Sequence, residues 1–178
     1  MGSYLSSASA PERMLEGGVP ASERRVLIAL DGSPGAQKAF NFWANAPGSR
    51  NDELILFSSL EMPNVLTGLL LLPSGTFEYD EYDKRFRAVR RRAEQLRQSM
   101  LVECRQRGLR CKFITSSDSS SPGAAIVEAA KRMGVNVVVV GCRGNNGIRR
   151  SILGSVSDYV LQHSARPIVV VPTKTDSD

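Results

Sequence analysis

A glycine-rich stretch, residues 141–155, combines residue types that can hold an anion. Three glycines are separated by two and then nine residues, and a serine follows the last of them: Gly141, Gly144, Gly154 and Ser155. Three arginines lie between the first and the last glycine: Arg143, Arg149 and Arg150. Glycine lets backbone N–H groups approach an anion closely, and arginine makes charge-assisted hydrogen bonds to phosphate. The stretch therefore predicts a phosphate-binding turn.

The elements expected on either side support that prediction. An apolar run over 135–140 precedes the stretch, and a helix is expected from Ser155 to about His163. The amino terminus of a helix has free N–H groups and a dipole that favours anions, and Ser155 and Ser157 add hydroxyl donors. The stretch matches neither G-x-x-x-x-G-K-[ST] nor G-x-G-x-x-G. From composition alone, a surface loop with a C-capping glycine remains an alternative.

The histidine and cysteine content excludes several kinds of site. The only histidine is His163, so a histidine metal cluster is impossible, and zinc spacing of Cys and His is absent. A Ser-His-Asp triad would need His163, which we interpret instead as a helix-terminal residue near the last carbonyls. The cysteines, Cys104, Cys111 and Cys142, have no paired spacing and fit a reduced, cytoplasmic compartment. We assign no catalytic residue and no metal ligand.

The net charge of +5 is modest, and much of it lies in one run, KRFRAVRRRAEQLRQ, residues 84–98. This run is either a nucleic-acid patch or the solvated face of a helix from about Tyr79 to Arg107. Apolar residues recur at steps of three and four and form one stripe: Tyr82, Phe86, Val89, Ala93, Leu96 and Met100. Four arginines fall off that stripe: Arg87, Arg90, Arg91 and Arg97. Because no aromatic side chains interleave them to stack bases, we favour the solvated face and expect no nucleic-acid partner.

Apolar strands alternate with helices along the chain. Strands are expected within 24–33, 52–61, 109–116, 135–141 and 166–172. Ser33 is the expected cap of a helix beginning at Pro34, and Ser121 and Gly134 are the expected cap and stop of a helix within 119–134. The alternation predicts an α/β fold with a doubly wound parallel sheet and helices on both faces. In the order 3-2-1-4-5, ligands bind between strands 1 and 4, where residues 31–33 and 141–147 follow the strands.

The two ends of the chain are expected to lie outside this domain. Residues 1–23 predict a disordered tail, 24–173 one domain, and 174–178 a flexible end. No run of roughly 18 apolar residues predicts a transmembrane helix, and the first residues lack a secretory signal pattern. Gly2 followed by Ser6 matches the myristoylation pattern. A single acyl chain anchors only marginally, so no stable membrane insertion is expected.

Two segments resemble the universal stress proteins: VLIALDGS, residues 26–33, and NVVVVGCRGNNGIRRSILGSVSDYVLQHSARPIVVVP, residues 136–172. The ATP-binding branch of that family carries G-2x-G-9x-G-[ST], which matches Gly141, Gly144, Gly154 and Ser155. The resemblance covers roughly residues 24–173 and implies a Rossmann-like five-stranded sheet that binds ATP, or ADP or AMP. Mg²⁺ is expected with ATP because the triphosphate carries it.

The resemblance also implies roles for single residues. Asp31 would lie against the adenosine end of the nucleotide, with Ala29 and Leu30 at the pocket floor. Ser59 stands where the backbone reads the adenine edge; many members have an aliphatic residue there, so this position departs from the pattern. Ribose and phosphates would contact Gly141, Arg143 and Gly144. The phosphates would be held at the helix start by Gly154, Ser155, Val156 and Ser157.

The function implied by the resemblance is that of an ATP-binding regulatory protein in stress responses. A slow ATPase or nucleotidyl transferase, and a nucleotide-free dimeric scaffold or chaperone-like protein, are the alternatives. The family commonly dimerises through its last strand, and the apolar segment Pro167–Pro172 suits an edge strand that must be paired. The long insert 62–83 either forms a flap beside the site or packs as a buried turn, and we favour the flap.

Overall fold

Five parallel strands form one sheet in the computed structural model, which describes residues 24–60, 79–117, 121–142 and 153–173. The strand order is β3-β2-β1-β4-β5. The bounds are β1 Arg25–Ala29, β2 Glu53–Ser59, β3 Arg110–Ser116, β4 Val137–Gly141 and β5 Ile168–Val171. The predicted fold class and strand order are therefore confirmed.

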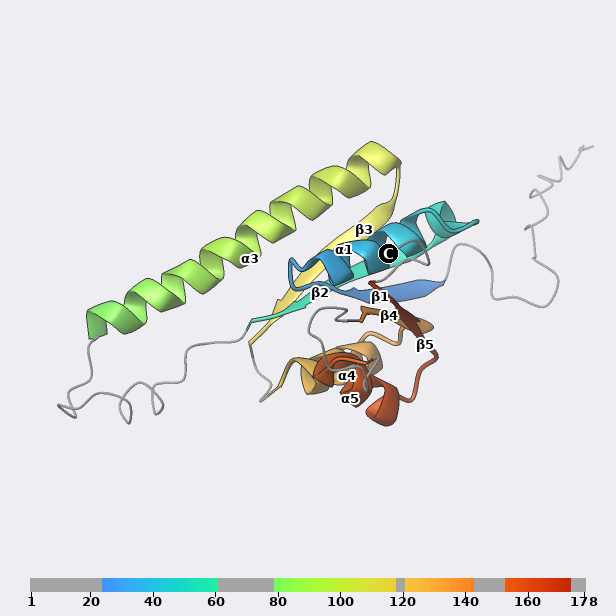
Figure 1. Ribbon diagram of the computed structural model, residues 1–178. Coiled ribbons are helices and arrows are strands. Elements are labelled where there is room, and N and C mark those ends of the chain that lie inside the picture. Colours follow the sequence, from blue (N-terminus) through green and yellow to red (C-terminus); the bar gives the residue numbers. More distant parts are fainter. Residues whose placement is uncertain (1–23, 61–78, 118–120, 143–152, 174–178) are drawn as a thin grey trace, which may run out of the picture.

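Helices cover both faces of this sheet (Figure 1). The helices are α1 Pro34–Ala44, α3 Tyr79–Arg107, α4 Pro122–Arg132 and α5 Ser155–His163, with a short 3₁₀ turn, η1, at Ser49–Asn51. In the hydrophobic clusters, α1 and α3 pack on one face, through residues such as Phe40 and Met100. On the other face α4 and α5 pack through residues such as Ala129 and Val160.

Side-chain alternation along the strands explains why both faces are covered. On β1, Val26 and Ile28 belong to the cluster under α1 and α3, whereas Leu27 belongs to the cluster under α4 and α5. All three side chains are fully buried. A strand that is apolar on both faces is stable only in a sheet with helices on each side, as parallel sheets have.

Serine caps fix where two of the helices begin. The Ser33 hydroxyl accepts a hydrogen bond from Ala36 N at 3.2 Å, and the Ser121 hydroxyl accepts one from Ala124 N at 3.3 Å. Each cap is followed by proline at the first helical position, where its missing N–H costs nothing. Gly134 follows α4 with φ of 60°, a conformation that ends a helix and favours glycine. The predicted caps and stop are confirmed.

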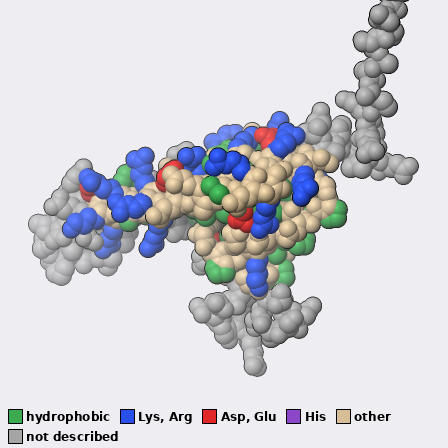
Figure 2. Space-filling view, turned by 90° about the horizontal axis from the view of Figure 1, so that it is seen from above, with side chains coloured by type: hydrophobic (Ala, Val, Ile, Leu, Met, Phe, Trp, Pro, Cys, Tyr) green, Lys and Arg blue, Asp and Glu red, His purple; other side chains and the backbone are tan. Residues whose placement is uncertain are grey.

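Helix α3 extends beyond the strands at its amino-terminal end (Figure 1). Met100 and Cys104, in its second half, are buried in the core. The arginines predicted to face solvent, Arg87, Arg90, Arg91 and Arg97, are exposed. Figure 2 shows Lys and Arg side chains gathered along the part of α3 that extends beyond the strands. No helix in the described ranges combines the length and apolarity needed to cross a membrane.

A buried carboxylate ties the first two strands to α1 at the amino-terminal edge of the sheet. Asp52 is 1% exposed and accepts two hydrogen bonds from Arg24, at 2.7 and 2.9 Å. It also accepts a hydrogen bond from the Trp43 indole at 3.0 Å. The hydrogen bond to Asp52 raises the pKa of Arg24. The carboxylate therefore accepts from three N–H groups of two residues, Arg24 just before β1 and Trp43 on α1.

We expect Asp52→Asn to lower the free energy of unfolding by about 1–3 kcal/mol, because one carboxylate oxygen becomes an NH₂ group that cannot accept from Arg24, and the negative charge opposite the guanidinium is lost. Urea denaturation followed by tryptophan fluorescence would measure this loss. Glu94→Gln is the control, because the Glu94–Arg97 pair on α3 is solvent-exposed and such pairs stabilise little. Equal shifts of the two midpoints would contradict the prediction.

Candidate functional site

A cavity of about 1080 Å³ lies where β1, β2 and β4 end. Nine of the predicted site residues line it: Ala29, Leu30, Asp31, Ser59, Gly141, Gly154, Ser155, Val156 and Ser157. The other two, Arg143 and Gly144, lie outside the described residues. The cavity is at the point where the strand order reverses, between β1 and β4. Residues far apart in sequence thus meet at one hollow.

The end of β1 forms one side of this cavity. Leu30 is buried, and its N–H donates to Phe57 O on β2 at 2.7 Å. The chain then turns sharply at Gly32, which has φ of 77°. Asp31 is exposed, and one of its carboxylate oxygens accepts from Ser33 N at 2.9 Å. This turn fixes Asp31 at the cavity between β1 and α1.

The end of β4 packs backbone to backbone against the first turn of α1. An ideal Cβ on Gly141 would lie 2.4 Å from Gly35 O and 2.9 Å from Ala36 N. A Cβ on Gly35 would in turn lie 3.1 Å from Cys142 O. The fold alone therefore requires glycine at 141, a reason separate from the predicted contact with a ligand.

The amino terminus of α5 presents unpaired amides to the cavity. Its cap is Gly154, with φ of −80° and ψ of 161°, which has no side chain to accept a hydrogen bond. Asp158 N donates to Gly154 O at 2.9 Å, whereas the amides of Ser155, Val156 and Ser157 have no acceptor among the described residues. Both α1 and α4, by contrast, are capped by serine. Free amides at a helix start can bind an anion.

A chain of hydrogen bonds links α1 to the ends of β4 and β5 on one side of the cavity. The Lys38 ammonium donates to Thr173 O. The Thr173 hydroxyl donates to Cys142 O at 2.9 Å, and Cys142 N donates to Val171 O at 2.8 Å. Lys38, Cys142 and Thr173 all line the cavity, and sequence reasoning missed them. Their closeness arises from the pairing of β4 with β5, which no local motif encodes.

Helix α3 supplies a further wall that sequence reasoning did not identify. Val89, Arg92, Ala93 and Leu96 line the cavity. Val89, Ala93 and Leu96 belong to the predicted apolar stripe, so the pattern indicated which side of the helix is covered. It did not indicate that part of this stripe faces a cavity. Of the insert 62–83, residues 62–78 lie outside the described ranges and 79–83 begin α3, so the flap stays a prediction.

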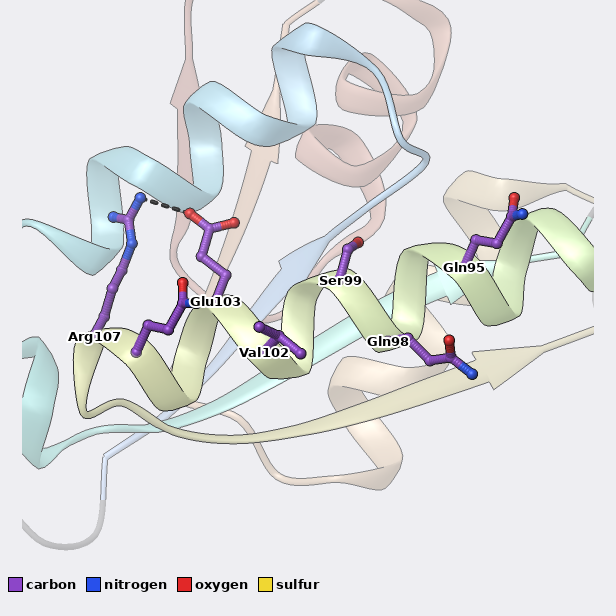
Figure 3. Close-up of a pocket in the computed structure, with 7 residues that line it drawn as sticks. Gln95, Gln98, Ser99, Val102, Glu103 and Arg107 are labelled. Carbon is purple, nitrogen blue, oxygen red and sulfur yellow. Dashed lines mark hydrogen bonds and ion pairs between the residues drawn. The ribbon is translucent and has the colours of Figure 1, made fainter.

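A second hollow of about 650 Å³ lies on the outer surface of α3 (Figure 3). Seven residues of this helix between Gln95 and Arg107 line it, including an ion pair of 2.6 Å between Glu103 and Arg107. None of the predicted site residues belongs to it. A hollow built from one helix offers no convergent groups from other elements, so the cavity at the strand ends is the candidate site.

The histidine and two of the three cysteines lie outside the cavity. His163 is exposed at the end of α5, with Nδ1 2.8 Å from Tyr159 O, which confirms its interpretation as a helix-terminal residue. Cys104 and Cys111 hydrogen-bond to each other in the core; this bond and burial raise the pKa of Cys104, and the same bond lowers the pKa of Cys111. Asp31 is the only carboxylate among the described residues of the cavity.

Residues 23–172 match the model of the universal stress protein family. The chain belongs to this family. A relative, the universal stress protein YxiE of Bacillus subtilis, is 26% identical over 151 residues, which cover 83% of this chain and 97% of the relative. The family part of the resemblance is thereby confirmed.

Several solved structures share the fold at low sequence identity, two of them universal stress proteins. Hypothetical protein MJ0577 is 20% identical, with a TM-score of 0.66 over 87% of this chain and 99% of that chain. A universal stress protein family protein of Arabidopsis thaliana with AMP bound is 18% identical, with a TM-score of 0.59 over 86% and 94%. A universal stress protein in complex with cAMP is 20% identical, with a TM-score of 0.57 over 86% and 99%.

We expect Gly141→Ala to destabilise this universal stress protein by about 1–3 kcal/mol, because the new methyl group meets backbone atoms of α1. Gly35→Ala is the graded control, since a Cβ there would lie 3.1 and 3.2 Å from its nearest neighbours, a less severe contact. Thermal and urea unfolding would rank the two variants. A larger loss for Gly35→Ala than for Gly141→Ala would contradict the packing argument.

Proposed function

We propose that this protein binds an adenine nucleotide, ATP in the first place, as a regulatory protein of stress responses. The observation that carries the proposal is that nine predicted residues from β1, β2, β4 and α5 line one cavity at the switch point of the sheet. Family membership supports the regulatory role. The nucleotide-binding domain is taken as residues 24–173, between the tails 1–23 and 174–178, and the protein as cytoplasmic.

In this proposal the nucleotide lies across the ends of β1 and β4. The adenosine end contacts Ala29, Leu30, Asp31 and Ser59, as the resemblance implies. The phosphates lie at the start of α5, where the amides of Ser155, Val156 and Ser157 have no acceptor among the described residues. An anion at an exposed helix start gains about 0.3–1 kcal/mol from the dipole, to which the amide hydrogen bonds add. Arg143 and Gly144 complete the predicted phosphate contacts.

Several observations favour an adenine nucleotide with a variable number of phosphates. The Arabidopsis thaliana neighbour has AMP bound, and another neighbour is in complex with cAMP. ATP is preferred for this chain because of the glycine spacing 141, 144 and 154. No group of three or more His, Cys, Asp or Glu side chains in the described ranges could hold a metal ion, so Mg²⁺ is proposed to arrive with the triphosphate.

The proposal also includes a homodimer through the segment Pro167–Pro172. Among the described residues β5 pairs only with β4, which leaves backbone groups on its other edge unpaired. Pro167 O and Val171 O accept hydrogen bonds from the β4 side, at 2.9 and 2.8 Å. Because pairing alternates along a parallel strand, Ile168 and Val170 direct their backbone groups to the free edge. Unpaired edges favour pairing with another chain.

For the nucleotide, we expect Ser155→Asp to weaken Mg-ATP binding about tenfold or more, because a carboxylate at the start of α5 repels phosphate. The same change favours the helix itself, so the melting temperature should not fall. Titration calorimetry of wild type and variant with Mg-ATP and AMP would measure the loss. Asn51→Asp is the control: it adds the same charge at an exposed position of η1, before β2 begins. No binding by wild type at millimolar ATP would overturn the proposed function.

For the dimer, we expect Val170→Pro to produce monomers, because proline removes the outward N–H while leaving the bonds to β4 in place. Val170→Thr keeps that N–H and should remain dimeric. Sedimentation velocity at micromolar concentration would separate the two species. A monomer mass for wild type would rule out this dimer.

A further inference from the structure

We infer that Arg92 of α3 is a phosphate-binding residue of the cavity, which contributes a cation from a wall outside the predicted glycine-rich cradle. The inference rests on the proposed function, because it assigns a further contact to the same ligand. Sequence resemblance gave α3 no role in binding. The assignment rests on the position of Arg92 in the cavity wall, on its having no interaction partner among the described residues, and on the other charged side chains of the cavity.

Arg92 stands on the stripe of α3 that faces the cavity. Val89, Arg92, Ala93 and Leu96 are spaced by three, one and three residues, so they lie on one side of the helix, and all four line the cavity. Arg92 thus interrupts a wall that is otherwise apolar. Arg90 and Arg91, its neighbours in sequence, do not line the cavity.

Three other arginines of α3 have interactions that account for their charge, whereas Arg91 has none among the described residues and lies outside the cavity. Arg87 forms an ion pair with Asp83 at 2.7 Å, and Arg97 forms one with Glu94 at 2.9 Å. Arg90 lies over the Phe86 ring, 5.7 Å from its centroid. Arg92 has no ion pair, hydrogen bond or ring contact with any part of the chain that the structure describes. Its guanidinium is therefore available to a ligand.

The other charged groups of the cavity leave this role to Arg92. Asp31, Lys38 and Arg92 are the charged side chains among the described residues that line it. The Lys38 ammonium already donates to Thr173 O. The guanidinium carries five donors in a planar fork that matches phosphate oxygens, and a cleft concentrates its field. An unpartnered guanidinium therefore suits an anionic group better than an apolar one.

The core fixes where the backbone of Arg92 lies, while its side chain is exposed. Met100, two turns further along α3, is buried with 2% exposure in the cluster beneath α1 and α3. Leu96, one turn closer, packs against the same cluster. The helix therefore holds the Arg92 backbone at the cavity before a ligand binds, which reduces the ordering cost of the contact.

Calorimetry with adenosine, AMP and Mg-ATP tests the assignment on wild type, Arg92→Gln, Arg92→Lys and Arg91→Gln. We expect Arg92→Gln to weaken ATP binding about tenfold, to weaken AMP binding less, and to leave adenosine binding unchanged. Arg92→Lys should recover part of the loss because it keeps the charge. Arg91→Gln removes the same charge from an exposed position outside the cavity and should change ATP binding by less than about twofold. The difference between Arg92→Gln and wild type should shrink with added salt.

The controls separate failure of this assignment from failure of the proposed function. Wild type that binds ATP, with equal losses in Arg92→Gln and Arg91→Gln, would overturn the role of Arg92 alone. An equal loss for adenosine and ATP would place the contact at the base or ribose and would likewise overturn it. Wild type that binds no nucleotide would overturn the proposed function, and this assignment with it. Matching circular dichroism and melting temperatures would establish that all variants are folded.

Discussion

The close approach of β4 to α1 is the constraint on which the candidate site depends. Gly141 and Gly35 allow two backbones to meet where an added Cβ would lie 2.4 Å from a carbonyl oxygen. This contact brings the first turn of α1 beside Cys142, whose N–H and carbonyl are bonded to Val171 and Thr173. The ends of β4 and β5 and the start of α1 thus form one rigid rim. Residues of this rim, including Gly35, Gly141 and Cys142, line the cavity.

The two glycines that bound the cavity on the β4 and α5 side differ in what their identity reveals. Gly141 is required by packing, so its presence would be expected in this fold even without a ligand. Gly154 has dihedral angles that any residue can adopt, and serine would cap a helix there better than glycine does. Glycine at this cap leaves the first amides of α5 without a side-chain acceptor. Residue 154 is therefore more informative about anion binding than residue 141, although one motif contains both.

Local rules were sufficient to predict the sheet, the caps and the crevice between strands 1 and 4, whereas the roles of the individual site residues came from the family resemblance. Ser33 and Ser121 act within four residues of their own positions, and strand alternation restricts the topology to very few sheets. The α3 wall could not be predicted in this way. Val89, Ala93 and Leu96 marked a covered side of the helix, but which neighbour covers it depends on how a 29-residue helix packs across the sheet. Arg92 was missed for the same reason, since a cation beside an apolar stripe is ordinary on a solvated helix.

Ion pairs are distributed unequally between the amino-terminal and carboxyl-terminal ends of the strands. At the amino-terminal edge, Arg24 pairs with Asp52, and Glu53 pairs with both Arg25 and Lys112. The hydrogen bond from Lys112 lowers the pKa of Glu53, so this contact favours the charged state of the Glu53 carboxyl. At the carboxyl-terminal edge, no ion pair within the described ranges engages Asp31, Lys38 or Arg92. Binding of a phosphate in this cavity would therefore not require an ion pair to be broken first. The ion pairs described above lie at the other end of the strands, outside the cavity.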